Sequence, residues 1–177
     1  MTTPPPASLP PELHRPMALE RIPPHGLQMV VTATPPECAA LAARLRIPGI
    51  RALSCRFQLH RLPAGEVAAE GELRARIVQT CIVSLDDFTA NVTEPFRVLF
   101  VPASKANDEA ELLSSDIESD DEIPYEGVFI DLGEAVAEQL ALALDPYPRK
   151  PGAVLPEDFA GPDTSPFSVL AALRRKN

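Results

Sequence analysis

Cysteine, histidine and paired carboxylate side chains are the residues of this chain that could carry chemistry. A cysteine nucleophile needs a histidine base within hydrogen-bond reach, and His60 follows Cys55 by five positions. In an extended strand such an odd spacing places the two side chains on opposite faces. Glu134 and Glu138 share one face of a predicted helix, where paired carboxylates are also typical of a solvated surface that complements the helix dipole. The residues therefore favour binding over catalysis, and we expect no enzyme activity.

Metal-binding side chains are few and scattered. The chain has three histidines and three cysteines: His14, His25, His60, Cys38, Cys55 and Cys81. No two of them have the close spacing that is typical of a structural zinc site with four ligands. An odd number of isolated thiols fits small buried side chains in a reducing compartment. There is also no glycine-rich phosphate loop, so we expect no metal and no other cofactor.

Arginines gather between residues 44 and 76. Seven lie there against three acids: Arg44, Arg46, Arg51, Arg56, Arg61, Arg74 and Arg76. Arg56, Arg74 and Arg76 alternate with apolar residues, which places them on the polar faces of neighbouring predicted strands. With Gln79 they form a candidate RNA- or protein-binding patch. The alternative, an ordinary solvated strand face, stays open because the chain has no tryptophan and few free aromatic side chains for base stacking.

The net charge of -9 comes mostly from one segment. Eight of the 25 acids crowd into residues 103–124, where Lys105 is the only base. Serines accompany them and aromatic residues are missing, so we expect a disordered acidic loop that interrupts the domain. It is interpreted as a solvating linker, a binder of a basic partner or a metal site. The candidate residues for a basic partner are Asp116, Glu118, Asp120, Asp121 and Glu122.

Hydrophobic periodicity predicts the elements that position these groups. Capping-box sequences open two helices, near 35–47 and 132–144. Runs with a period of two over 50–62, 67–83 and 92–100 predict strands joined by short turns. We expect an α+β fold in which an antiparallel sheet, a partly barrel-like meander, is covered by the two main helices.

Proline-rich ends flank this domain. We expect a Pro-rich N-terminal tail over residues 1–26, an α+β domain over 27–148, and a Pro-rich tether with a short basic C-terminal helix over 149–177. No run approaches the roughly 18 apolar residues of a membrane span, and the opening residues lack a signal-peptide pattern. We therefore expect a cytoplasmic protein. The basic end of the chain is a further candidate for RNA or protein contact: Arg174, Arg175 and Lys176.

Three stretches follow one another in a specific order. Residues 71–81 read Gly-Glu-Leu-Arg-Ala-Arg-Ile-Val-Gln-Thr-Cys, and an apolar strand to Val101 follows. After the acidic segment come Ile-Asp-Leu-Gly-Glu at 130–134 and a helix that leads to Pro148. The chain closes on Pro-Phe-Ser-Val-Leu-Ala-Ala-Leu-Arg-Arg-Lys at 166–176. With this order, from about residue 37 onward, the chain resembles the YceD family of large-subunit ribosomal RNA accumulation proteins.

The resemblance implies a non-enzymatic factor that supports 23S rRNA synthesis, processing or stability, and so large ribosomal subunit biogenesis. It implies large-subunit ribosomal RNA or a ribosomal protein as the partner. The alternative is an adaptor that binds a basic protein through the acidic loop and the C-terminal amphipathic helix. Many members of the family carry a C-x-x-C pair that is typical of zinc ligation, but here Val78 stands three residues before Cys81. Zinc is therefore not carried over to this chain.

Overall fold

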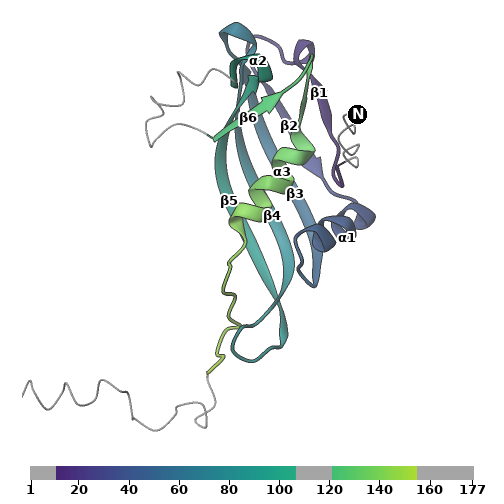
Figure 1. Ribbon diagram of the computed structural model, residues 1–177, viewed down its shortest axis with the longest axis vertical. Coiled ribbons are helices and arrows are strands. Elements are labelled where there is room, and N and C mark those ends of the chain that lie inside the picture. Colours follow the sequence, from purple (N-terminus) through teal and green to yellow (C-terminus); the bar gives the residue numbers. More distant parts are fainter. Residues whose placement is uncertain (1–10, 107–120, 155–177) are drawn as a thin grey trace, which may run out of the picture.

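A five-stranded sheet forms the body of the protein in the computed structural model, which describes residues 11–106 and 121–154 (Figure 1). In spatial order the strands are β2 (Leu27–Thr32), β3 (Gly49–Arg61), β4 (Val67–Thr80), β5 (Asp87–Pro102) and β6 (Asp121–Tyr125). β3, β4 and β5 form the predicted antiparallel meander. β2, which the sequence analysis did not predict, joins it antiparallel to β3, and β6 joins the end of β5 in parallel. The α+β class is confirmed. The described sheet is not closed into a barrel, because its two edge strands, β2 and β6, do not pair with each other.

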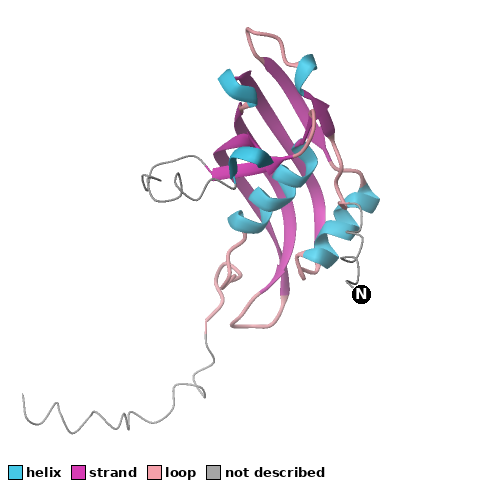
Figure 2. Cartoon of the chain, turned by 45° about the horizontal axis from the view of Figure 1, so that its top comes forward, coloured by secondary structure: helices cyan, strands magenta, loops and turns pink. Residues whose placement is uncertain are grey.

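Both main helices cover the same face of this sheet (Figures 1 and 2). α1 (Pro35–Arg44) begins after Thr34, whose backbone N–H donates to the Glu37 carboxylate at 2.7 Å in the predicted capping box. α3 (Leu132–Ala143) begins after Asp131, whose carboxylate accepts the N–H groups of the first turn. These side chains satisfy helix N–H groups that have no partner within the helix. The two predicted helices are thus confirmed, with slightly earlier ends.

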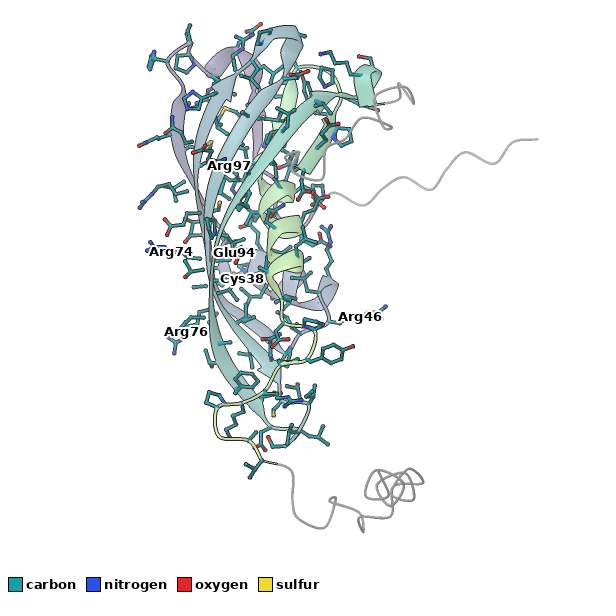
Figure 3. The ribbon with its side chains drawn as sticks, turned by 90° about the vertical axis from the view of Figure 1, so that its left-hand side faces the viewer. Cys38, Arg46, Arg74, Arg76, Glu94 and Arg97 are labelled. Carbon is teal, nitrogen blue, oxygen red and sulfur yellow. The ribbon has the colours of Figure 1, made fainter. Side chains whose placement is uncertain are left out.

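The core lies between the helices and the inward-facing residues of the strands. Side chains alternate along a strand, and β3 and β4 turn their apolar set toward the helices. The largest fully buried side chains come from both layers: Leu41, Leu53, Phe57, Leu59, Leu73, Ile77, Phe100, Leu132 and Leu140. The opposite face of the sheet has no helix over it in the part of the chain that the structure describes (Figure 3).

The N-terminal segment is part of the fold, which corrects the predicted tail over residues 1–26. β1 (Pro16–Ala18) pairs with β7 (Phe129–Asp131), and a 3-10 turn over Leu19–Arg21 follows. Leu13, Met17 and Ile22 are buried in the core. Proline content misled the prediction because Pro16 opens a short two-stranded ribbon, a position where a missing N–H is tolerated. Residues 1–10 lie outside the described part of the chain.

Ordered elements also occupy both ends of the predicted acidic loop. A one-turn helix, α2 (Ala103–Ala106), follows β5, and the loop's last residues from Asp121 belong to β6. β6 is held by Tyr125, whose hydroxyl donates to the Gly65 carbonyl at 2.5 Å in the turn between β3 and β4. Residues 107–120 lie outside the described residues, as does the predicted C-terminal helix, which falls within 155–177.

Candidate nucleic-acid interface

The uncovered sheet face carries the three arginines predicted to lie together. Arg56 is on β3, and Arg74 and Arg76 are on β4. Their side chains alternate with buried neighbours, so they project from the face opposite the helices. Figure 3 shows Arg74 and Arg76 on one side of the sheet and α3 on the other. The strand register brings the three arginines into adjacent rows, because Arg56 pairs with Glu72 and Arg74 pairs with Ser54.

Two carboxylates partly neutralise this face. The Arg74 guanidinium lies 2.6 Å from the Glu72 carboxylate. This hydrogen bond is the main reason why the pKa of Glu72 lies below its usual value, and the charge of Arg56 lowers it further. Arg97 on β5 lies 3.4 Å from Glu70 in a second pair. Within the described residues, no carboxylate lies within ion-pair distance of Arg56 or Arg76.

The uncovered face has a positive balance within an acidic protein. Its outward charged side chains in the regular strand register are four arginines and three carboxylates: Arg56, Arg74, Arg76, Arg97, Glu70, Glu72 and Asp87. Hydroxyl and amide groups occupy several of the other outward positions: Thr32, Ser54, Gln58, Thr89, Asn91 and Thr93. These groups contact phosphate and sugar oxygens but stack on no base. A shallow pocket of about 140 Å³ lies among Val30, Ser54, Arg56, Glu72 and Arg74.

Sequence reasoning missed Arg97, because a single arginine in an apolar run carries no patch signal. Arg97 lies between Phe96 and Val98 in the sequence, and this alternation predicts an outward side chain on β5. Register then brings it beside Glu70, since these two residues pair directly. The uncovered face is therefore broader than the predicted patch and extends over β5.

Gln79 belongs to the interior and not to this surface, which corrects its prediction as a contact residue. Its side chain is 6% exposed. The amide donates to the Asp145 carbonyl at 3.2 Å and so fixes the chain that follows α3. A short apolar stretch from Ile77 to Val78 precedes Gln79, and the end of the strand is covered by the segment after α3. Gln79 lies three residues after the outward-facing Arg76 on the same strand, and this odd spacing turns its side chain to the inner face.

Two other arginines of the predicted cluster, Arg44 and Arg46, lie on the helix side of the sheet. Arg44, at the end of α1, binds the carboxylate of Glu134 at 2.5 Å and that of Glu12 at 3.0 Å. It therefore ties α1 to α3 and to the N-terminal segment on the helix side of the molecule. Figure 3 shows Arg46 on this helix side too. The sequence cluster from 44 to 76 is thus divided between the two faces.

The paired carboxylates Glu134 and Glu138 are confirmed as a surface feature on one helix face. Arg44 binds the first of them. The pKa of Glu138 is raised, chiefly by desolvation and then by the negative charge of Glu134. Glu134 also lies in the first turn of α3, where a carboxylate complements the helix dipole.

Some predicted contact residues fall outside the described part of the chain. They are Asp116, Glu118, Asp120, Arg174, Arg175 and Lys176. Asp121 and Glu122 are described and lie exposed on β6. Among the candidates for a basic partner, these two therefore have a defined position, at the edge of the sheet next to the end of β5.

The cysteine and histidine side chains lie as the strand parity predicts. Cys55 is buried and His60 is exposed, on opposite faces of β3. Burial raises the pKa of the Cys55 thiol to about 12 and also raises that of Cys38. Cys81 differs, because its sulfur accepts the backbone N–H groups of Val83 and Ser84, each at 3.4 Å. Hydrogen bonds from Ser84 are the main cause that lowers the Cys81 pKa to about 7.

The surroundings of Cys81 do not fit a zinc ion. Val78, three residues earlier, is an apolar side chain that is 8% exposed. The described residues contain no group of three or more histidine, cysteine or carboxylate side chains that could hold a metal ion. The Cys81 sulfur instead accepts hydrogen bonds from the N–H groups of Val83 and Ser84 in its own turn.

Fold and surface together define the class: an α+β domain whose sheet is covered on one side and presents an arginine-bearing polar face on the other. A sequence model of the family described as "Large ribosomal RNA subunit accumulation protein YceD" matches residues 69–174. This match covers more than half of the 177 residues, and the chain belongs to this family. It includes Arg74, Arg76 and Arg97 but begins after Arg56.

Searches of the curated proteins and of the solved structures each found no significant match. No helix among the described residues is long and apolar enough to cross a membrane.

Proposed function

We propose that this protein supports the accumulation of 23S rRNA by binding RNA in the cytoplasm, and that it catalyses no reaction. Its family is named for large ribosomal RNA subunit accumulation, which connects the chain with large-subunit biogenesis. The observation that carries the proposal is the concentration of arginine on one uncovered sheet face of a protein with a net charge of -9. Arginine on a polar surface is the common means of holding a phosphate backbone.

The uncovered face supports contacts to the RNA backbone more than readout of bases. Arg56 and Arg76 are exposed and have no carboxylate at ion-pair distance among the described residues. Outward threonine and asparagine side chains on β5 add donors beside them. Phe57, Phe96 and Phe100 all belong to the opposite, helix-covered face, so stacking platforms do not contribute here. Recognition by shape and phosphate position follows from this composition.

Binding without catalysis is supported by the places of the reactive groups. Cys38, Cys55 and Cys81 are all buried. The exposed His60 is on the uncovered face, on the other side of the sheet from Cys55. A partner adaptor role through the acidic segment remains the alternative, and the two roles differ in whether RNA contacts the uncovered face.

The test is sedimentation of cell lysate at low salt, with the protein traced across free, precursor, subunit and ribosome fractions. The variant reverses three charges of the uncovered face: Arg56→Glu, Arg74→Glu and Arg76→Glu. A control with the same net charge reverses three exposed arginines elsewhere: Arg21→Glu, Arg46→Glu and Arg61→Glu. We expect the first variant to leave the large-subunit precursor fractions and to fail to restore 23S rRNA in a depleted strain.

The control variant should sediment like the wild type. If both variants leave the precursor fractions equally, net charge and not the uncovered face explains the association. If both remain bound, the uncovered face is not the contact, and the adaptor role is favoured. In purified form, replacing one phosphate-binding arginine should reduce the slope of log affinity against log salt by about one.

A further inference from the structure

Among the strands that the structure describes, one side of the sheet ends in an unpaired strand edge. β6 pairs only with Val98–Pro102 of β5. Figure 1 shows β5 at the border of the sheet, with β6 beside its upper part alone. The preceding residues, from Asp87 to Arg97, pair with β4 on one side and with no described strand on the other. Their outward backbone N–H and C=O groups are available for pairing with another chain.

Pro95 shows which backbone groups face the free edge. Proline is accommodated within a strand where its nitrogen points away from the neighbouring strand, and Pro95 lies within the regular β4–β5 ladder opposite Glu72. Backbone direction alternates along a strand, so the N–H groups of Thr89, Asn91 and Thr93 point to the same free edge. Because Pro95 has no N–H to donate, it ends the part of the edge that can pair with an added strand, which therefore runs from Asp87 to Glu94.

An open groove of about 380 Å³ runs along this edge. Five successive residues of β5, from Ala90 to Glu94, line it. Since successive side chains alternate between faces, a groove that contacts all five lies along the strand edge itself. Its other wall is formed by the end of α3 and the chain that follows: Ala143, Asp145, Pro148 and Arg149.

The groove is lined by apolar and polar groups together, and its charge balance is acidic. Phe88, Ala90, Val92 and Pro148 are half-buried there. Two carboxylates, those of Glu94 and Asp145, line the groove against one base, Arg149. Beyond its upper end, the negative charge of Asp121 contributes to the raised pKa of Glu138, so acidic groups continue along α3 and β6.

We infer that the Asp87–Glu94 edge of β5 binds an extended basic peptide of another protein as an added strand. Main-chain hydrogen bonds to Thr89, Asn91 and Thr93 hold the peptide, and alternate apolar side chains enter the groove. Lysine or arginine residues at groove-facing positions near the ends of the peptide meet Glu94, Asp145 and the acidic groups beyond. This edge adjoins the uncovered sheet face, but the peptide is held by the backbone of β5 and by the groove on the helix side, so the inference does not depend on RNA binding to the uncovered face.

The experiment uses the full chain and a synthetic peptide of roughly ten residues, enough to pair with this edge, in which valine and threonine alternate between terminal lysines. Binding is measured by fluorescence anisotropy, and amide hydrogen exchange is followed by NMR. We expect the N–H groups of Thr89, Asn91 and Thr93 to exchange freely without peptide and to become protected with it. The same peptide with glutamate in place of lysine should bind at least about tenfold more weakly.

A matched pair of variants tests the strand pairing. Asn91→Pro removes one N–H from the free edge, as Pro95 does, without removing a bond to β4. Asn91→Ala changes the side chain and keeps the N–H. We expect about tenfold weaker peptide binding for Asn91→Pro and little change for Asn91→Ala, with both variants folded by circular dichroism.

Three results would overturn the inference. The first is a lysine peptide that does not bind, or that binds Asn91→Pro as tightly as wild type. The second is protection of the three edge amides in the free protein at every concentration, which would show that the chain covers its own edge. The third is protection that appears only as the protein concentration rises, which would assign the edge to a second copy of the chain.

Discussion

Phe57 and Phe96 pack edge to face, with their ring centroids 5.7 Å apart and their planes at 84°. Gly71 pairs with both of them, since it lies between Phe57 on β3 and Phe96 on β5. A Cβ atom at Gly71 would stand 2.1 Å from the Phe96 ring. The absence of a side chain at Gly71 therefore makes room for the Phe96 ring, and the Phe96 ring covers the Gly71 backbone.

Replacing Gly71 with alanine is expected to destabilise the protein by about 1–3 kcal/mol, because the added methyl group overfills a packed site. Urea unfolding measures the change. Gly49→Ala is the control within the same sheet, since a Cβ there would lie 3.8 Å from Val78, an ordinary contact. Equal stability of the two variants would contradict the packing described for Phe96.

Asp131 joins α3 to the N-terminal segment. Its carboxylate accepts N–H groups from Gly133 at 2.9 Å and from Arg15 at 2.8 Å. Asp131→Ala should cost about 1–3 kcal/mol of unfolding free energy, because both the helix cap and the bond to Arg15 are lost. Asp131→Asn keeps an acceptor oxygen and should retain most of the stability. Thermal unfolding of the two variants distinguishes them, and a loss as large for asparagine as for alanine would argue against the cap.

Glu37 provides a pH-dependent contribution to stability. Its carboxylate binds the Arg15 guanidinium through two hydrogen bonds of 2.8 and 2.9 Å. This pair, followed by the Thr34 N–H, lowers the pKa of Glu37 from 4.5 to about 2. The stabilisation is present above the unfolded pKa and is lost as the pH falls toward 2. Urea midpoints should therefore fall less steeply below pH 4.5 for Glu37→Gln than for wild type.

Cys81 should titrate first among the three cysteines. Backbone N–H groups that point at its sulfur lower its pKa from 9.0 to about 7, whereas burial raises the pKa values of Cys38 and Cys55. Ultraviolet thiolate absorbance should show a midpoint near pH 7 that is missing in Cys81→Ser. Because the folded pKa is lowered, the stability of wild type relative to Cys81→Ser should rise as the pH increases from 7 toward 9. A first midpoint near pH 9 would contradict this.

Local patterns in the sequence determined the two covering helices, the three long strands and the face that each side chain takes. The capping residues Thr34 and Asp131 act over one helical turn, and the alternation in β3 and β4 acts between neighbours. Such short-range signals can be read without knowing the rest of the fold. For the same reason, the sequence was sufficient to place Arg56, Arg74 and Arg76 on one polar face.

Only the tertiary structure decided which distant segments meet. The N-terminal residues look like a tail by composition, yet Arg15 pairs with Glu37 and Leu13 packs against Gly133, where a Cβ would stand 2.1 Å from the Leu13 carbonyl oxygen. The burial of Gln79 against the Asp145 segment, the pairing of Arg44 with Glu134 and Glu12, and the unpaired edge of β5 likewise depend on residues far away in the chain. Composition and periodicity report on neighbours in sequence, whereas these features arise from long-range packing and strand pairing.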